Sequence, residues 1–313
     1  MFKPSVIIPT YNRPEELKNC VKSLLEQTVK PYEIIIVNDG NLKEPPLEKE
    51  CREAGIRYLY FKKDTPGLTA SRNLGIKAST GDIIFFLDDD VILNPDYIEE
   101  ILSVYKEDAT GRVGGVGGAI TNPKPIKLIQ RLRRIVNIVF LISGFHEGKV
   151  LASGFSTNYG TTGSPIRKKT EVDFLSGGVS AFRREIFDSF SFDTGFFHKY
   201  RIGEDKEFTY RVSRKYKLIS TPDAKLLHME SPAMRPDDFQ RGRMFVLFSH
   251  IFFTRYIEKG ILSRLLFYYA LSGYALSRAI IFVFSPNKRT LGRLRGVIHG
   301  IKEIFSGEAA VVG

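Results

Sequence analysis

Three consecutive aspartates, Asp88, Asp89 and Asp90, directly follow an apolar run at residues 83–87. Carboxylates this close repel one another unless they lie in open solvent or share a positive partner. A divalent cation is one such partner, because Mg²⁺ and Mn²⁺ prefer oxygen ligands and Mg²⁺ often binds substrate phosphates as well. If strand geometry continues past Leu87, Asp88 and Asp90 point to one side and Asp89 to the other. We therefore expect a metal–diphosphate site at Asp88 and Asp90, with a solvated Asp-rich turn as the alternative.

Other polar residues also suit a nucleotide or a transferred group. Asp39 precedes Gly40 after the apolar run 34–37, and it is either a turn acid or a hydrogen-bond acceptor for a base or ribose. Arg72 is either a surface helix residue or a planar fork for a diphosphate. Glu204 and Asp205 begin a predicted helix over 204–216, where acids commonly cap the helix.

The elements that must position these residues alternate between strand and helix as far as about residue 106. Strands are predicted at residues 5–8, 34–37, 58–60 and 83–87, and helices at 14–25, 68–78 and from Pro95 onward. A Gly-rich strand or bend is expected at 114–118, and two short strands are expected within 172–182. The alternation predicts an α/β protein with a doubly wound sheet, in which ligands bind at the carboxyl ends of the strands.

Five motifs in order resemble family-2 inverting glycosyltransferases with the GT-A fold, over roughly residues 4–230. The motifs read SVIIPTYNRPEELKNCVKSLLEQT, EIIIVNDG, GLTASRNLGIKASTGDIIFFLDDDV, FLSGGVSAFRREIF and GEDKEFTYRV. The resemblance implies a mixed sheet flanked by helices and a nucleoside-diphosphate-sugar donor, with UDP favoured. It also implies a hexosyltransferase-type transfer in which Mn²⁺ or Mg²⁺ binds the diphosphate leaving group.

The resemblance also assigns roles to residues. Asp39 matches the acid that reads the base, Asp90 the direct metal ligand, and Asp88 a ribose or water-mediated metal contact. Asp89 occupies a variable position, so we expect it to be the replaceable member of the triplet. His228 matches a metal-binding histidine of several members. The nucleotide-sugar set comprises Pro9, Thr10, Tyr11, Arg13, Glu15, Asp39, Arg72, Asp88, Asp89, Gly177 and Gly178.

The acidic pair Glu204-Asp205 matches the family's catalytic pair, with the Asp position as the candidate base. Inverting transfer is a single displacement, so one base must deprotonate the acceptor hydroxyl while cations stabilise the departing diphosphate. A polyprenyl-phosphate glycosyl synthase of the same fold is the alternative, because a phosphate acceptor needs no strong base. A non-catalytic nucleotide-binding or membrane-scaffold protein is the alternative from another class.

The net charge of +11 is concentrated near the C-terminus. Residues 241–302 hold eleven Lys/Arg and one acid, and they include the apolar stretches 244–253 and 265–284. Arg278 makes a transmembrane span costly, so interfacial or core-packed helices are favoured over a span. Residues 126–142 have a similar character. We expect this region to bind an anionic membrane surface and, lacking a nucleic-acid module, to bind no nucleic acid.

Domain boundaries and location follow from the same patterns. We expect a catalytic domain at 1–235, with a nucleotide-binding half at about 1–120 and an acceptor half at about 121–235. Basic, apolar, membrane-associating helices are expected at 236–313. Two cysteines, Cys20 and Cys51, are too few for a secreted disulfide framework, and the N-terminal apolar run is short for a signal peptide. The expected location is the cytoplasm, peripherally on the cytoplasmic face of a membrane, where a lipid-linked glycan is a candidate acceptor.

Overall fold

A computed structural model describes residues 2–121, 128–159, 166–197, 202–229 and 236–307. The chain folds into two compact units. The first comprises Met1–Pro123, Pro165–Thr194 and Glu204–Ala233, and the second comprises Lys124–Ser164, Gly195–Gly203 and Met234–Gly313. The domain boundaries predicted from the sequence remain predictions.

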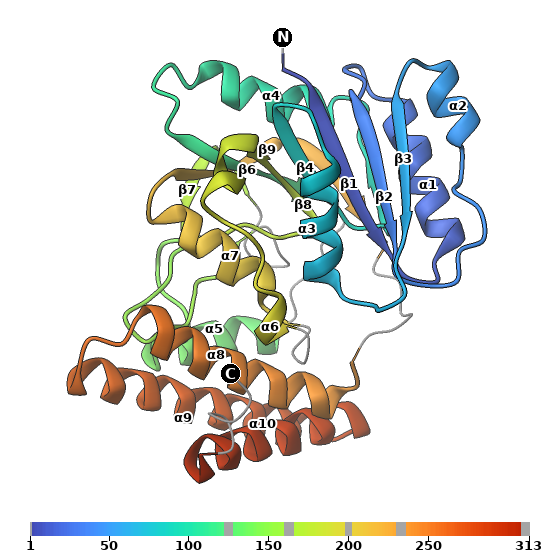
Figure 1. The fold of residues 1–313 in the computed structure, drawn as a ribbon. Coiled ribbons are helices and arrows are strands. Elements are labelled where there is room, and N and C mark those ends of the chain that lie inside the picture. The colour runs from blue at the N-terminus through green and yellow to red at the C-terminus, as the bar shows by residue number, and fades with distance from the viewer. Residues whose placement is uncertain (1, 122–127, 160–165, 198–201, 230–235, 308–313) are drawn as a thin grey trace. The chain divides into compact units, whose positions relative to one another are not determined.

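One mixed sheet forms the centre of the first unit, in the order β3-β2-β1-β4-β8-β6-β9-β5, with β7 paired to β9 (Figure 1). Strands β3, β2, β1 and β4 are parallel neighbours, whereas β8 runs antiparallel to both β4 and β6. The strands are β1 Pro4–Thr10, β2 Glu33–Asn38, β3 Arg57–Lys62, β4 Ile83–Leu87, β5 Val91–Leu93, β6 Val113–Ile120, β7 Thr170–Val172, β8 Val179–Arg183 and β9 Lys217–His228.

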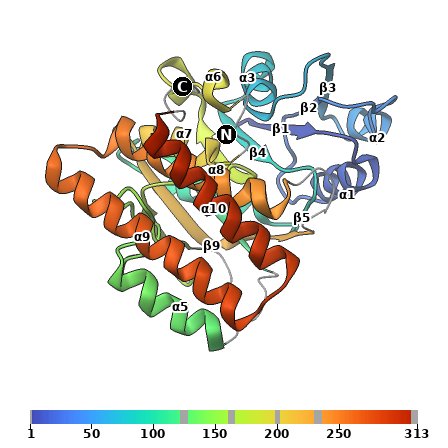
Figure 2. The ribbon, with the colours of Figure 1, turned by 90° about the horizontal axis from the view of Figure 1, so that it is seen from below.

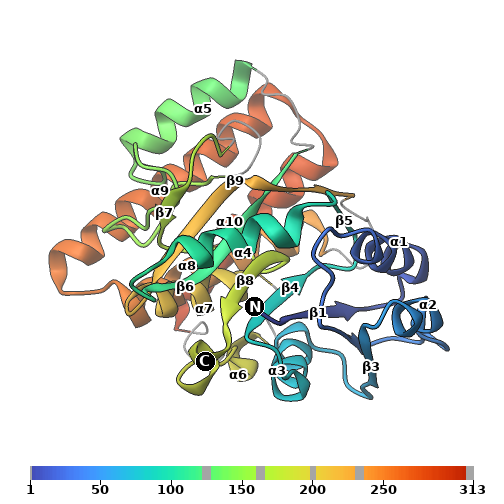
Figure 3. The same cartoon turned by 90° about the horizontal axis from the view of Figure 1, so that it is seen from above.

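Helices cover both faces of the parallel strands, which explains why those strands are apolar without alternation (Figure 3). Val6 and Ile8 of β1 pack with Leu17 of α1 in the core. Ile7 points to the other face, where the absence of a side chain at Gly75 lets α3 approach: a Cβ there would lie 2.4 Å from Ile7 Cγ2. The helices of this unit are α1 Pro14–Leu25, α2 Glu48–Glu53, α3 Leu68–Ala78, α4 Tyr97–Glu107, the 3₁₀ helix η1 Arg184–Asp188 and α7 Glu204–Ser213.

Several predicted boundaries were wrong in instructive ways. β1 does not stop before Pro9 but runs to Thr10, because β4 pairs only with Pro4–Ile7 and the missing N–H of Pro9 disrupts no pairing there. The helix predicted over 204–216 ends at Ser213, and β9 follows it. Helix α2 and strand β5 were not predicted, because they are too short to show a clear period.

The second unit is helical, as predicted for the C-terminal region. Glycines let α8 and α10 pack closely: a Cβ on Gly296 would lie 2.0 Å from the carbonyl oxygen of Phe239, and one on Gly242 would lie 2.3 Å from that of Arg293. The Arg243 guanidinium of α8 also donates two hydrogen bonds to the buried Glu303 carboxylate of α10. The remaining helices of the chain are α5 Leu128–Val139, α6 Thr194–Phe197, α8 Asp238–Tyr256, α9 Ile261–Phe284 and α10 Lys288–Ser306.

Candidate active site

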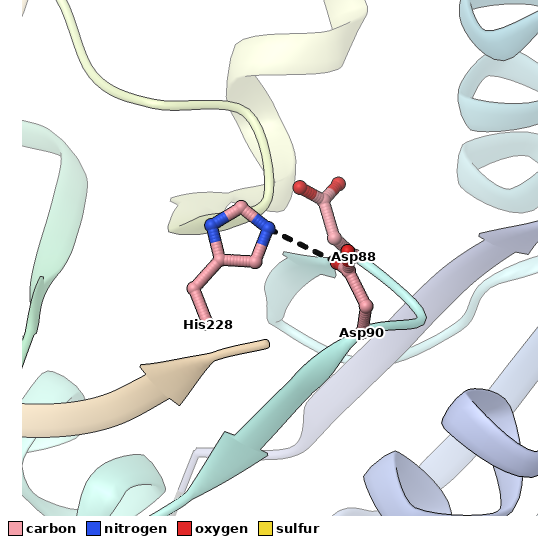
Figure 4. A group of neighbouring side chains, drawn as sticks. All are labelled: Asp88, Asp90 and His228. Atoms are coloured by element: carbon pink, nitrogen blue, oxygen red, sulfur yellow. Dashed lines mark hydrogen bonds and ion pairs between the residues drawn. The ribbon is translucent and has the colours of Figure 1, made fainter. Parts of the chain in front are cut away.

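The aspartate triplet forms the turn between β4 and β5 at the carboxyl end of the parallel strands. β5 pairs antiparallel with β9, and this register places Val91 opposite His228. The His228 imidazole therefore lies beside Asp90, with 3.0 Å between Nε2 and Oδ1 (Figure 4). One ligand atom from each of Asp88, Asp90 and His228 falls within 4.8 Å of the other two. The two carboxylates suit Mg²⁺ or Mn²⁺, and an imidazole can complete the ligand set of Mn²⁺.

The middle aspartate contacts a different set of groups, although the strand geometry assumed for the triplet ends at Leu87. Asp89 is 4% exposed, and its carboxylate accepts hydrogen bonds from Thr10 Oγ1 at 2.8 Å and Arg13 Nη1 at 2.9 Å. The same Arg13 nitrogen lies 3.6 Å from Asp90 Oδ2. Burial raises the pKa of Asp89 to about 6, although Thr10 and Arg13 oppose that shift. Asp89 therefore ties the triplet to the loop that follows β1.

The other predicted nucleotide contacts at the end of β1 lie in this loop or on the elements that flank it. Pro9 is buried within β1, Tyr11 is half-buried, and Glu15 is exposed in the first turn of α1. This loop meets the loop after β2, because Asn12 Oδ1 accepts a hydrogen bond from the Asn41 amide at 2.8 Å.

Asp39 lies after β2 and is held by groups from β3 and α3. Its carboxylate accepts hydrogen bonds from the Gly67 amide at 3.0 Å and from Ser71 Oγ at 2.8 Å. Lys63 Nζ lies 2.9 Å from Asp39 Oδ1 and also donates to Ser71 Oγ at 2.8 Å. The arrangement fixes a buried carboxylate at the strand edge, where it could accept a hydrogen bond from a base.

Arg72 links the triplet to the acidic pair. Its guanidinium lies 3.2 Å from Glu204 Oε1 and 3.8 Å from Asp88 Oδ1, and it stacks over the Phe192 ring at 5.2 Å. The side chains of Arg72 and Glu204 are 3% and 13% exposed, so these two charges interact with little screening, whereas the Asp88 side chain is 37% exposed. Arg72 therefore bridges the carboxyl end of β4 and the first turn of α7.

The two glycines predicted near the sugar make room for these charged groups. A Cβ on Gly177 would lie 2.7 Å from Arg72 Nη2, and one on Gly178 would lie 2.1 Å from the Asp88 carboxyl carbon. The Gly177 amide also donates to Asp205 Oδ2 at 3.2 Å. Neither position accepts a larger residue without displacing an arginine or an aspartate of the site.

The two acids at the start of α7 are held differently. Asp205 accepts hydrogen bonds from the Gly177 and Lys206 amides, the second at 2.7 Å to Oδ1. Glu204 instead faces Arg72. Burial, with the Asp205 charge nearby, raises the pKa of Glu204 to about 7 even though Arg72 opposes the shift. The pair thus offers one carboxylate oriented by backbone amides and one that titrates near neutral pH.

Three neighbours of these residues were missed from the sequence. Lys63 lies at the carboxyl end of a predicted strand and Ser71 precedes Arg72, so their positions were signals that could have been used. Phe192 is far from Arg72 in the chain, and the sequence carried no sign of that contact.

Comparisons with known proteins identify the family and the fold. The model of the family described as Glycosyl transferase family 2 matches residues 5–190. The poly(ribitol-phosphate) beta-N-acetylglucosaminyltransferase TarP of Staphylococcus aureus is 34% identical over 134 residues, which are 40% of this chain and 41% of TarP. Across the curated relatives compared, the matched segment spans only 14% to 41% of the relative's own length.

Solved structures share the fold. TarS residues 1–349 of S. aureus, also solved with UDP-GlcNAc, match with a TM-score of 0.58 at 14% identity, covering 99% of this chain and 83% of that one. The mannosyltransferase PcManGT of Pyrobaculum calidifontis, solved with GDP-Man and Mn²⁺, matches with a TM-score of 0.52 at 15% identity, covering 99% and 84%. At these identities the likeness bears on the fold alone, and it confirms the predicted GT-A-type mixed sheet flanked by helices.

Proposed function

This chain belongs to glycosyl transferase family 2, and we propose that it transfers a sugar from a nucleoside-diphosphate sugar to an acceptor hydroxyl with inversion at the anomeric carbon. The observation that carries the proposal is the bridge formed by Arg72. It connects Asp88, a member of the candidate metal set, to Glu204 of the acidic pair. A leaving-group site and a base site therefore adjoin one another within the first unit.

The leaving-group side combines a metal set with a cation. Asp90, Asp88 and His228 would hold Mn²⁺ or Mg²⁺, which would supply positive charge to a diphosphate. The Arg72 guanidinium lies 3.8 Å from the Asp88 carboxylate, so it would add a fixed positive charge on the same side of the site. Its planar geometry suits phosphate oxygens. Because Arg72 is buried and already oriented, it costs little reorganisation as charge develops on the leaving group.

On the other side, Asp205 is the proposed base. Its carboxylate is oriented by two backbone amides, whereas the Glu204 carboxylate faces Arg72. Asp205 would accept the proton of the acceptor hydroxyl as the oxygen attacks the anomeric carbon. Glu204 would act as a positioning residue that fixes Arg72 between the two halves of the site.

The proposed donor is a UDP-sugar. Asp39 is a fixed, buried hydrogen-bond acceptor after β2, where we place the nucleotide. Its carboxylate can accept a hydrogen bond from the imide N–H of uracil. TarS was solved with UDP-GlcNAc and TarP is named a beta-N-acetylglucosaminyltransferase, which supports this choice. PcManGT was solved with GDP-Man, so a guanine nucleotide is the alternative to be compared.

Location and acceptor belong to the same proposal. Among the described residues, α9 is a helix long and apolar enough to cross a membrane. We propose peripheral attachment to the cytoplasmic face of a membrane, where the acceptor hydroxyl would be carried on a glycan or lipid-linked molecule.

Donor binding and hydrolysis test the proposal directly. Purified protein would be screened by thermal shift against UDP-sugars and GDP-sugars with Mn²⁺ or Mg²⁺, and donor hydrolysis would be measured for the best binder. We expect metal-dependent stabilisation by a UDP-sugar that Asp90→Asn abolishes and that the exposed control Asp96→Asn retains. If no nucleotide sugar binds or is hydrolysed, the chain is a scaffold rather than an enzyme.

The Asp205→Asn variant separates a hydroxyl acceptor from a phosphate acceptor. Loss of a base should lower turnover by about 10²–10⁴-fold while donor binding stays near normal. Near-normal turnover would instead favour the polyprenyl-phosphate glycosyl synthase.

A further inference from the structure

The exposed large apolar side chains of the described chain are concentrated in the second unit. Leu262 and Val283, near opposite ends of α9, are 69% and 70% exposed. Most of the other exposed apolar side chains lie on the same helix or its neighbours. On α5, α9 and α10 they are Ile135, Val139, Ile261, Leu262, Leu265, Tyr268, Tyr269, Leu276, Val283, Phe284, Ile298 and Phe305.

The three helices lie side by side, so these residues form one surface (Figure 2). Tyr269 of α9 donates a hydrogen bond to the Val139 carbonyl of α5 at 3.2 Å. Tyr268 of α9 stacks on Phe305 of α10 with ring centroids 5.5 Å apart. We call the exposed side chains of α5, α9 and α10 the three-helix face.

The three-helix face has no exposed acidic side chain. The sequences of α5 and α9 contain no Asp or Glu, and the single acid of α10, Glu303, is 6% exposed and bonded to Arg243. On α10, Arg295, Ile298, Lys302 and Phe305 follow at i, i+3, i+7 and i+10, which places two cations and two apolar side chains on one stripe. Cations therefore alternate with apolar side chains on this surface.

The opposite side of α9 is buried within the second unit. Phe267 stacks on Phe253 of α8 and Tyr274 stacks on Phe245, each with centroids 4.5 Å apart. A Cβ on Gly273 would lie 2.1 Å from the Phe140 ring. A helix crossing the bilayer would carry Arg278, at present stacked over Tyr274 at 4.8 Å, into hydrocarbon at high cost.

We propose that the three-helix face inserts into the headgroup region of an anionic membrane, with α9 lying in the membrane plane rather than crossing it. Apolar side chains would enter the acyl boundary while the cations of α10 meet anionic headgroups. A second copy of the chain fits less well, because an isologous contact would place two acid-free, cationic surfaces against each other. The inference rests on the proposed membrane attachment and deepens it by naming the surface and its orientation.

Vesicle flotation of the full chain tests whether membrane binding requires anionic lipid. Donor and metal are left out, so that the result is independent of sugar transfer. We expect binding to vesicles containing about one-third phosphatidylglycerol and little binding to pure phosphatidylcholine. Arg295→Glu with Lys302→Glu should weaken binding at least about tenfold. The matched control, Lys77→Glu with Lys106→Glu, reverses two exposed charges of the first unit and should leave binding near normal.

The depth of α9 can be measured because the chain contains no tryptophan. Leu262→Trp and Leu276→Trp place single probes near one end and towards the middle of α9, both on exposed positions. Brominated lipids should quench both probes at the same shallow depth if α9 lies in plane. In a helix that crossed the bilayer, the Leu276→Trp probe would lie deep in the hydrocarbon, roughly 20 Å along the helix axis from the interfacial Leu262→Trp probe.

Three results would overturn the proposal. Unequal probe depths would show a span, and flotation unaffected by the α10 double variant would place lipid binding elsewhere. If the chain does not bind anionic vesicles but forms a dimer that Leu265→Ser disrupts, the three-helix face is a protein–protein interface. Loss of donor hydrolysis with intact flotation would refute the proposed transfer and leave the membrane surface standing.

Discussion

At the scale of single residues, Asp89 is bound more firmly than its variable position in the family suggested. The sequence led us to expect that Asp89 is the replaceable aspartate, and that expectation has not been tested. Its contacts favour the opposite outcome, because Thr10 and Arg13 both donate to its buried carboxylate. Removing one partner of a buried ion pair leaves the other charge uncompensated.

We therefore predict that Asp89→Ala lowers the free energy of unfolding at pH 5 by about 1–3 kcal/mol, because its hydrogen bonds with Thr10 and Arg13 are lost. The raised pKa of Asp89, about 6, keeps its own buried charge from offsetting that loss at this pH. Mn²⁺ affinity should also fall, because Arg13 contacts both Asp89 and Asp90. Urea denaturation and calorimetric metal titration measure the two effects, with the exposed Asp96→Asn as control. Unchanged stability and unchanged metal affinity would restore the view that Asp89 is replaceable.

Glu204 gives the site a pH dependence whose sign can be worked out. Its pKa in the folded chain is raised from 4.5 to about 7, so between these values the folded state binds more protons than the unfolded state. Stability contributed by this group is therefore present below about pH 4.5 and lost as the pH rises through 7. The folded protein bears the unfavourable buried charge at alkaline pH.

We predict that Glu204→Gln becomes more stable relative to the native chain as the pH rises from 5 to 8. The change should be on the order of 2 kcal/mol, because a tenfold change in the acid dissociation constant corresponds to about 1.4 kcal/mol and the carboxyl group is partly accessible to solvent. Denaturation in EDTA at several pH values measures it without metal. Parallel stability curves for the two proteins would contradict the prediction.

At the scale of elements, the sequence predicted those helices and strands that local sequence patterns determine. Apolar runs and helical periodicity identified β2, β4, α1 and α3, and the acids after β4 identified the site edge. The pairing of β5 with β9 could not be read locally, since three residues of β5 carry no clear period and their partner lies over 130 residues away. His228 was proposed from family resemblance. The pairing of β5 with β9 explains why its imidazole lies beside Asp90.

A second element-scale constraint is the turn before β8, which lies against the triplet. Gly178→Ala should push the Asp88 carboxylate away, because the added Cβ would start 2.1 Å from its carboxyl carbon. We expect Mn²⁺-dependent donor binding to weaken about tenfold or more while the fold is retained. Gly292→Ala is the control, since its nearest neighbour would be 3.6 Å away. Equal donor affinity in Gly178→Ala would mean that Asp88 does not contribute to the site.

At the scale of the whole molecule, the candidate active site and the proposed membrane-binding surface belong to different compact units. The candidate metal set, Asp39, Arg72 and the acidic pair all belong to the first unit, and the three-helix face belongs to the second. The sequence predicted a basic C-terminal region, but it assigned residues 121–235 to an acceptor half of the catalytic domain. Those domain boundaries stay predictions. The second compact unit contains α5, which packs on α9 far along the chain and whose basic, apolar character resembles that of the C-terminal helices.

This division predicts separable unfolding transitions in calorimetry, since each unit has its own buried core. UDP with Mn²⁺ should raise the transition of the first unit, by about 2.7 kcal/mol at a ligand concentration 100 times Kd. Gly296→Ala should lower the other transition by about 1–3 kcal/mol, because its Cβ would start 2.0 Å from the Phe239 carbonyl oxygen. Gly292→Ala, on the same helix with 3.6 Å of room, should have no such effect and should gain up to about 1 kcal/mol from helix propensity. A single transition that both UDP and Gly296→Ala shift would mean that the two units unfold as one. A change in the second unit would then affect the candidate site through the stability of the whole chain.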